Sequence, residues 1–94
     1  MTQATILAPG NTAATSSDVV VPAGETVTVG LYSATASAVP VAMQMYVYQD
    51  TPGADNLVAT LENYNRSTVL VGPGTFRIKR PDYAGAAFGA FSEV

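Results

Sequence analysis

The sequence contains no cysteine, no histidine and no tryptophan, and only 12% of its 94 residues are charged. The absence of cysteine excludes a disulfide framework, thiol nucleophiles and the usual structural zinc sites. The absence of histidine removes the commonest general base and metal ligand, so Ser-His-Asp catalysis is impossible. Because a typical soluble domain carries about 25% charged residues, most of this surface must consist of alanine, serine, threonine, glycine and glutamine.

The sequence also lacks an apolar segment of membrane-spanning length. Its longest stretches without charge, 1–17 and 26–49, are interrupted by proline, glycine and polar residues. Neither offers the ~20 predominantly apolar residues that a spanning helix needs. The first basic residue is Arg66, so the basic region that opens a secretory signal is missing as well. We therefore expect no membrane partner and no cleaved export signal.

The few charges are unevenly distributed along the chain. Residues 1–55 contain four acids and no base, whereas residues 56–94 contain three acids and all four bases, which gives a net charge of −3. Nucleic-acid binding relies on lysine and arginine that neutralise phosphates, so we expect no nucleic-acid partner. An acidic surface at one end of the molecule and one basic strand are instead suited to binding a protein surface of complementary charge.

Alternation of polar and apolar residues predicts strands along most of the chain. The clearest segments are 26–31, 41–49 and 75–79. The residues expected to face a core from these strands are Val27, Val29, Leu31, Val41, Met43, Met45, Val47, Phe76 and Ile78. Shorter candidate strands cover 4–8, 18–21, 57–61, 68–71 and 87–92.

Turn-forming residues separate these segments at spacings of about eight to twelve residues, which is typical of an all-β sandwich or barrel. The one place for a helical turn is 33–38. We predict a single all-β domain over residues 1–94, an immunoglobulin-like antiparallel sandwich of about seven to eight short strands. Residues 1–17 leave three alternatives open: a disordered arm, a first strand, or an extended arm that adds to a neighbouring subunit.

Two segments fifty residues apart, 19–26 and 69–76, resemble each other. Each has a short apolar strand, a tight Pro/Gly turn and an outgoing strand. A duplicated ancestor is one interpretation. We favour the other, that both are corners at which the chain crosses between two sheets, because only the turn residues match.

The acidic residues offer weak candidates for chemistry. Each of the seven acids lies beside a turn or a strand end, where solvated surface is the plain expectation, so we expect no catalytic carboxylate pair and no enzyme. The loop from Asp50 to Asn56 contains oxygen ligands that suit Ca²⁺ but lacks the spacing of a known calcium loop. We favour a hairpin loop capped by Asp50, and expect no metal site and no cofactor.

The one basic cluster consists of Arg77, Lys79 and Arg80. Alternation places Arg77 and Lys79 on one outward face, with Arg80 at the end of the strand. Charged side chains that guard an exposed strand against edge pairing are the plainer interpretation. A docking surface for an acidic partner is the alternative.

Aromatic residues point more strongly to a partner. If Met43, Met45 and Val47 face the core, Tyr46 and Tyr48 share the opposite face, and tyrosine is enriched at protein interfaces. Phe88 and Phe91 are three residues apart, so on a strand one of them lies outside the core. The candidate partner-binding residues are Tyr46, Tyr48, Arg77, Lys79, Arg80, Phe88 and Phe91. Coverage of these rings within the monomer is the alternative.

Two motifs resemble those of immunoglobulin-like sandwiches. The run from Val21 to Val29 places a Pro-Ala-Gly corner before a Thr-Val-Thr-Val strand, and the run from Pro73 to Ile78 is similar to the start of a penultimate strand. The cysteine pair and core tryptophan of antibody domains are absent. The whole chain also resembles small virion proteins of tailed bacteriophages, of the head decoration or cement type.

The resemblance to virion proteins implies a structural function. We expect a capsid decoration subunit that stabilises a phage head through contacts with the major capsid protein or other virion subunits. Such a protein is made in the host cytoplasm, lies on the capsid surface and forms a homo-oligomer, with a trimer as one form. The alternative is a receptor- or carbohydrate-binding module of a tail or head fibre, in which Tyr46 and Tyr48 stack on sugar rings.

Overall fold

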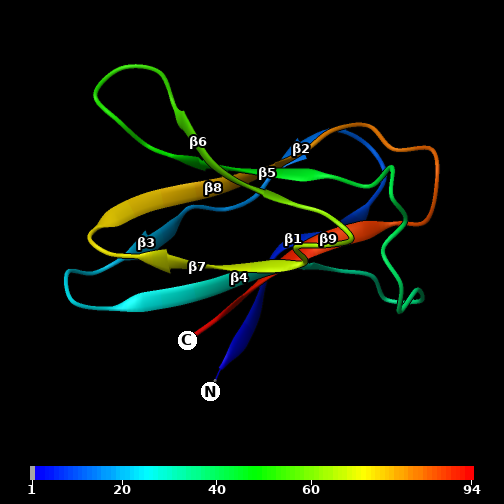
Figure 1. The fold of residues 1–94 in the computed structure, drawn as a ribbon, viewed down its shortest axis with the longest axis horizontal. Coiled ribbons are helices and arrows are strands. Elements are labelled where there is room, and N and C mark those ends of the chain that lie inside the picture. Colours follow the sequence, from blue (N-terminus) through cyan, green and yellow to red (C-terminus); the bar gives the residue numbers. More distant parts are fainter. Residues whose placement is uncertain (1) are drawn as a thin grey trace.

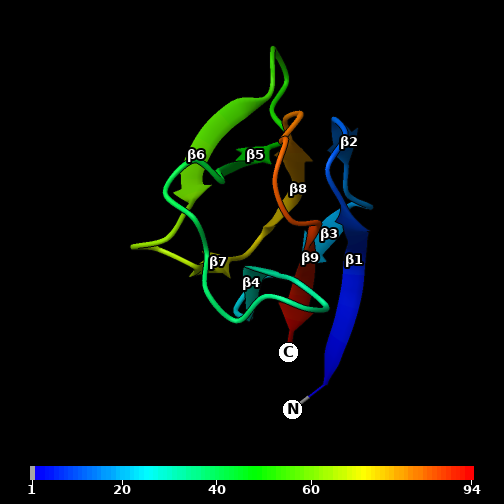
Figure 2. The same ribbon diagram turned by 90° about the vertical axis from the view of Figure 1, so that its right-hand side faces the viewer.

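The computed structural model describes residues 2–94 and shows two antiparallel sheets packed face to face (Figures 1 and 2). The first sheet has the order β1 (Gln3–Gly10), β9 (Phe88–Glu93), β4 (Thr26–Tyr32), β7 (Ser67–Val71). The second sheet has the order β2 (Ala14–Thr15), β8 (Gly74–Arg80), β5 (Met45–Gln49), β6 (Asn56–Leu61), and β3 (Val19–Val21) also pairs with β8. The predicted all-β sandwich is confirmed.

The strand count differs slightly from the prediction because residues 14–21 form two short strands, β2 and β3, along β8. The immunoglobulin-like topology stays a prediction. No helix long and apolar enough to cross a membrane is found among residues 2–94. The segment 33–38 forms bends, in which the Ser33 hydroxyl accepts a bond from the amide of Ala36 at 3.2 Å.

The core lies between the two sheets and follows the predicted alternation. Its fully enclosed side chains include Val29, Met43, Met45, Val47, Leu61, Ile78 and Phe88, all at 0% exposure. Val41 was predicted to be inward, and this is wrong, because its exposed fraction is 73%. β5 begins only at Met45, and a turn precedes it in which the amide of Met43 donates to the carbonyl of Pro40 at 3.0 Å.

The N-terminal segment crosses from one sheet to the other within the same domain. β1 pairs with β9 in the first sheet, and β2 pairs with β8 in the second. Ser16 fixes the crossing, because its amide donates to the carbonyl of Ile78 at 2.8 Å and its hydroxyl accepts from the amide of Ile78 at 2.9 Å. Three alternatives were open for residues 1–17, and the segment from Gln3 to Gly10 forms a first strand.

The two similar corners lie against each other and both connect the sheets (Figure 1). The first leads from β3 to β4, and the second leads from β7 to β8. The amide of Gly72 donates to the carbonyl of Glu25 at 3.0 Å. A Cβ at Gly72 would overlap the carbonyl of Pro22, so only glycine fits this contact. This arrangement confirms the interpretation of both segments as crossings between sheets.

Candidate protein-binding surfaces

Four of the predicted partner-binding residues meet on the outer face of the second sheet. In the antiparallel pair of β5 and β8, Tyr46 lies opposite Lys79 and Tyr48 lies opposite Arg77. All four are half-buried, while the residues between them face the core. The period-two alternation of the sequence is enough to place them there, as predicted.

Arg77 is neutralised by three aspartates from two loops. Its Nε lies 3.2 Å from Asp18 Oδ1, its Nη2 lies 3.8 Å from Asp50 Oδ2, and its Nη1 lies 2.7 Å from Asp55 Oδ2. Hydrogen bonds to Asp55 and Asp18 raise the pKa of the Arg77 guanidinium above its ordinary value. Arg77 therefore remains charged and already has its counter-charges within the domain.

The loop between β5 and β6 is organised by these ion pairs. Asp50 turns toward Arg77 rather than capping the loop. The bond that closes the loop comes from Thr51, whose hydroxyl donates to the carbonyl of Ala54 at 2.6 Å. The two aspartates of this loop, Asp50 and Asp55, share the Arg77 guanidinium as their counter-charge.

Lys79 and Tyr48 form a contact of their own. The Lys79 Nζ lies 4.7 Å from the centroid of the Tyr48 ring and 3.9 Å from Asp55 Oδ2. Such a cation over an aromatic face is attractive, and it covers one face of the ring. The Tyr46 hydroxyl donates to Gln44 Oε1 at 3.1 Å. Most charges and polar ends on this face are thus paired within the monomer.

Arg80 and Phe88 lie in the interior and are not part of a candidate surface. Arg80 is 6% exposed. Its Nε donates to the carbonyl of Thr12 at 2.8 Å, and its Nη1 donates to the carbonyls of Ala8 at 2.9 Å and Phe88 at 2.8 Å. Phe88 packs edge-to-face on Tyr83, with centroids 6.5 Å apart. The sequence could have indicated the burial of Arg80, because strand alternation places it on the same inward face as Phe76 and Ile78.

Phe91 lies on the outer face of the first sheet and is half-buried. It stands edge-to-face with Tyr32, with centroids 6.2 Å apart. The prediction that one of Phe88 and Phe91 lies outside the core is confirmed. Phe91 and the pair Tyr46 and Tyr48 belong to different sheets, so the candidate residues do not form one site.

A further candidate surface, which the sequence did not predict, lies where the two sheets end. β6 ends the second sheet and β7 ends the first, and both lie on the same side of the sandwich (Figure 2). Neither strand contains a charged residue. We call this side the open edge and define it by its exposed apolar residues, which are Leu57, Val58, Val69 and Val71.

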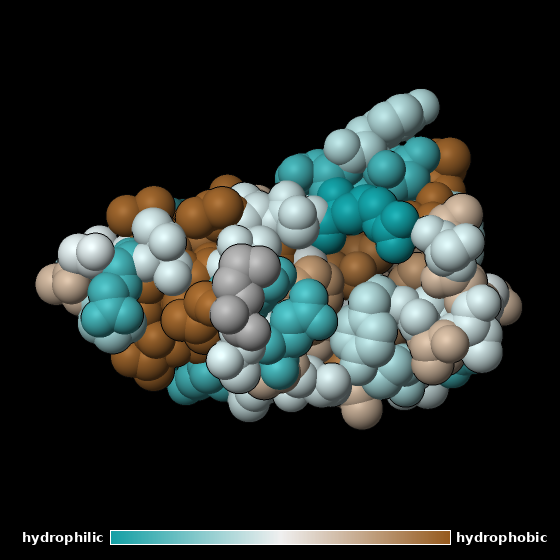
Figure 3. Space-filling view, turned by 90° about the horizontal axis from the view of Figure 1, so that it is seen from below, coloured by the Kyte–Doolittle hydropathy of each residue, from teal (hydrophilic) through white to brown (hydrophobic). Residues whose placement is uncertain are grey.

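A shallow groove of about 240 Å³ runs between the two strands of the open edge. It is lined by residues of β6 and β7 and reaches Leu70 and Phe76 of the core. In the view from below, hydrophobic side chains gather at the left, at the end of the molecule where β4 begins and β7 ends (Figure 3). Strand pairing is regular between β7 and β4, whereas the pairing of β6 with β5 is interrupted beside Val47. β7 is therefore the more regular free edge.

Comparisons of the chain with protein-family models, with curated proteins and with solved structures give no match.

Proposed function

We propose that this protein is a structural subunit that joins a larger protein assembly through the free edge of β7. The observation that carries the proposal is an edge strand of five residues without a charge, a proline or an irregular register. Natural sheet proteins usually protect edge strands with lysine, proline or bulges, because an open edge pairs with other chains. A protein that is permanently bound in an assembly needs less of that protection, because its partner covers the edge.

The side chains of β7 support docking by strand addition. Leu70 faces the core at 4% exposure, whereas its neighbours Val69 and Val71 point outward at 57% and 66%. Burial of a valine contributes about 1.5 kcal/mol or more when complete, so covering these two contributes about 2 kcal/mol. An added strand also gains main-chain hydrogen bonds along β7. The binding is passive and needs no titrating or nucleophilic group.

The assembly that we propose is the head of a tailed phage, with this chain as a decoration subunit on the capsid surface. This part of the proposal rests on the resemblance of the sequence to small virion proteins. The low charge and the neutral β surface support it, because they suit permanent contact with neighbouring subunits. The half-buried pair Tyr46 and Tyr48 provides a second contact area on the adjoining sheet face.

Mass spectrometry of gradient-purified particles from cells that carry the gene tests this function. We expect the wild-type chain to band with particles and the variant V69K/V71K to remain at the top of the gradient. Val41→Lys is the control, because Val41 is also exposed, at 73%, but lies in a turn and not in a strand. Equal recovery of V69K/V71K and wild type on particles would contradict the use of β7. Absence of the wild-type chain from every particle fraction would contradict the virion assignment.

A further inference from the structure

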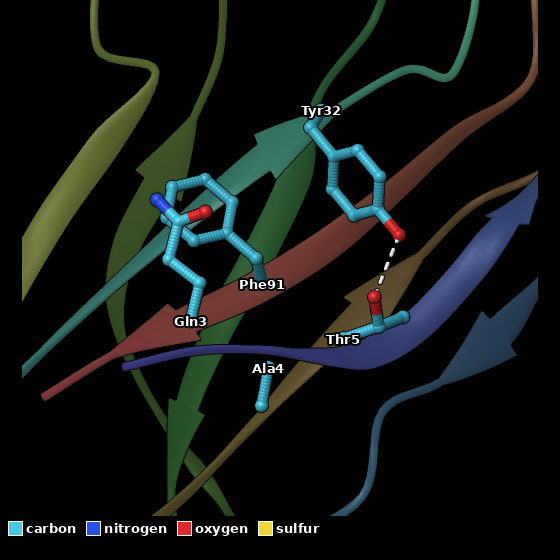
Figure 4. Close-up of a pocket in the computed structure, with 5 residues that line it drawn as sticks. All are labelled: Gln3, Ala4, Thr5, Tyr32 and Phe91. Carbon is cyan, nitrogen blue, oxygen red and sulfur yellow. Dashed lines mark hydrogen bonds between the residues drawn. The ribbon is translucent and has the colours of Figure 1, made fainter. Parts of the chain in front are cut away.

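A hollow on the outer face of the first sheet has the composition of a small-molecule site. It has a volume of about 430 Å³ and is lined by Gln3, Ala4, Thr5, Tyr32 and Phe91 (Figure 4). Small-molecule sites are concave, have volumes of about 300–1,000 Å³ and combine aromatic walls with a few polar groups. The hollow lies on β1, β4 and β9, away from the free edge of β7. It has no part in the function proposed above.

Strand pairing builds the aromatic floor of this hollow. Phe91 of β9 lies opposite Gly30 of β4 and Thr5 of β1. A Cβ on Gly30 would approach the Phe91 ring to 2.6 Å, so the ring lies down against the sheet over the glycine. Tyr32 meets Phe91 edge-to-face at an interplanar angle of 72°. The glycine thus lets a phenylalanine lie low on the sheet, and the tyrosine forms a wall beside it.

Neutral hydrogen-bonding groups surround this floor. The hydroxyls of Tyr32 and Thr5 lie 2.9 Å apart and bond to each other, which leaves each with further bonding capacity. The Gln3 side chain extends toward the Phe91 ring, which its amide overlaps in the view of Figure 4, and its Nε2 donates to Glu93 Oε1 at 3.4 Å. The side-chain carbonyl of Gln3 remains available as a hydrogen-bond acceptor. None of the residues that line the hollow carries a charge.

This chemistry selects a class of ligand. An anion is disfavoured, because none of the described residues that line the hollow is a cation and the Glu93 carboxylate lies beside Gln3. A purely aliphatic ligand would displace water from the remaining donor and acceptor sites of these hydroxyl and amide groups without replacing those hydrogen bonds, which costs free energy. A pyranose ring has one face of C–H groups, which can lie on an aromatic ring, and a rim of hydroxyls that donate and accept hydrogen bonds. We propose that the hollow between Tyr32, Phe91 and β1 binds a neutral saccharide.

A glycan array probed with the labelled full-length chain, displayed on streptavidin to raise avidity, tests this proposal. Neutral glycans that bind are then titrated as free oligosaccharides and followed by amide NMR shifts. We expect the shifts to centre on Thr5, Tyr32 and Phe91. Absence of binding to every neutral glycan on the array would overturn the proposal, as would shifts centred on Tyr46 and Tyr48 or binding restricted to charged glycans.

Two variants connect the binding to the hollow. Phe91→Ala removes the floor from an outward-facing, half-buried position, and we expect at least a roughly tenfold loss of affinity, equivalent to about 1.4 kcal/mol. Tyr32→Phe keeps the ring and removes only the hydroxyl, which reduces affinity without disturbing the packing. The matched control is Tyr46→Phe, which removes the same group from the other sheet. Unchanged affinity in folded Phe91→Ala and Tyr32→Phe would contradict the assignment.

Discussion

Arg80 provides the sharpest test of how the N-terminal segment is held. Replacement by methionine keeps a long apolar side chain and removes three hydrogen bonds to carbonyl groups of β1, the following turn and β9. The carbonyl of Phe88 is buried, and leaving it without a partner costs about 1–3 kcal/mol. The carbonyls of Ala8 and Thr12 belong to exposed residues, so water replaces those bonds at a loss of about 0.5–1.5 kcal/mol each.

These losses sum to about 2–6 kcal/mol in the free energy of unfolding. Removing a buried charge returns part of its desolvation cost, so we expect a value of about 2–4 kcal/mol for Arg80→Met. The free energy of unfolding is measured by urea titration followed by circular dichroism, because the chain has no tryptophan whose fluorescence could report unfolding. Small proteins lose about 1–3 kcal/mol of stability per molar urea, so the midpoint should fall by roughly 1 M or more.

Arg66→Met is the matched control for this experiment. Arg66 is exposed and donates one bond, from Nη1 to the carbonyl of Ser37 at 3.0 Å. We expect a change of less than about 1 kcal/mol there. If Arg80→Met is as mild as Arg66→Met, Arg80 does not hold the segment, and a role for it at a binding surface would have to be reconsidered.

Gly72→Ala should lower the free energy of unfolding by about 1–3 kcal/mol, because the added Cβ would overlap the Pro22 carbonyl. Calorimetry would show this as a lower Tm. Gly53→Ala is the control and should change Tm little, because no atom lies within 4 Å of a Cβ at that position. Arg77→Glu should lower Tm, because it places a fourth carboxylate among three aspartates. The difference in Tm from wild type should shrink in 1 M salt, because screening weakens the repulsion. A loss of Tm that does not depend on salt would contradict the electrostatic cause. In sedimentation at rising concentration, we expect the wild type to form a homo-oligomer and V69K/V71K to stay monomeric; a wild type that remains monomeric would contradict self-association through β7.

Local pattern predicted the strands well because each strand presents one face to the core. Val27, Val29 and Leu31 are buried where alternation places them, and Met45 and Val47 follow the same rule. The rule fails where the backbone leaves the strand, as at Val41, which lies in the turn after a proline.

Two features of the surface could not be predicted because they depend on pairing between distant segments. Alternation places Tyr32 on the face opposite Val27, Val29 and Leu31, and it leaves one of Phe88 and Phe91 outside the core without saying which. Only the antiparallel register of β4 with β9, which sets Gly30 opposite Phe91, brings the two rings together. The same holds for the open edge, since the sequence of β7 does not say that it ends its sheet.

Backbone hydrogen exchange by NMR, on the free chain at a concentration at which it is monomeric and on the chain bound to purified particles, tests docking through the free edge of β7. We expect amides at the free edge of β7, from Ser67 to Val71, to exchange more slowly on particles, while those at the free edge of β1 do not change. Slower exchange confined to the outer face of the second sheet around Tyr46 and Tyr48, or no protection of β7 in a chain that is bound, would contradict it.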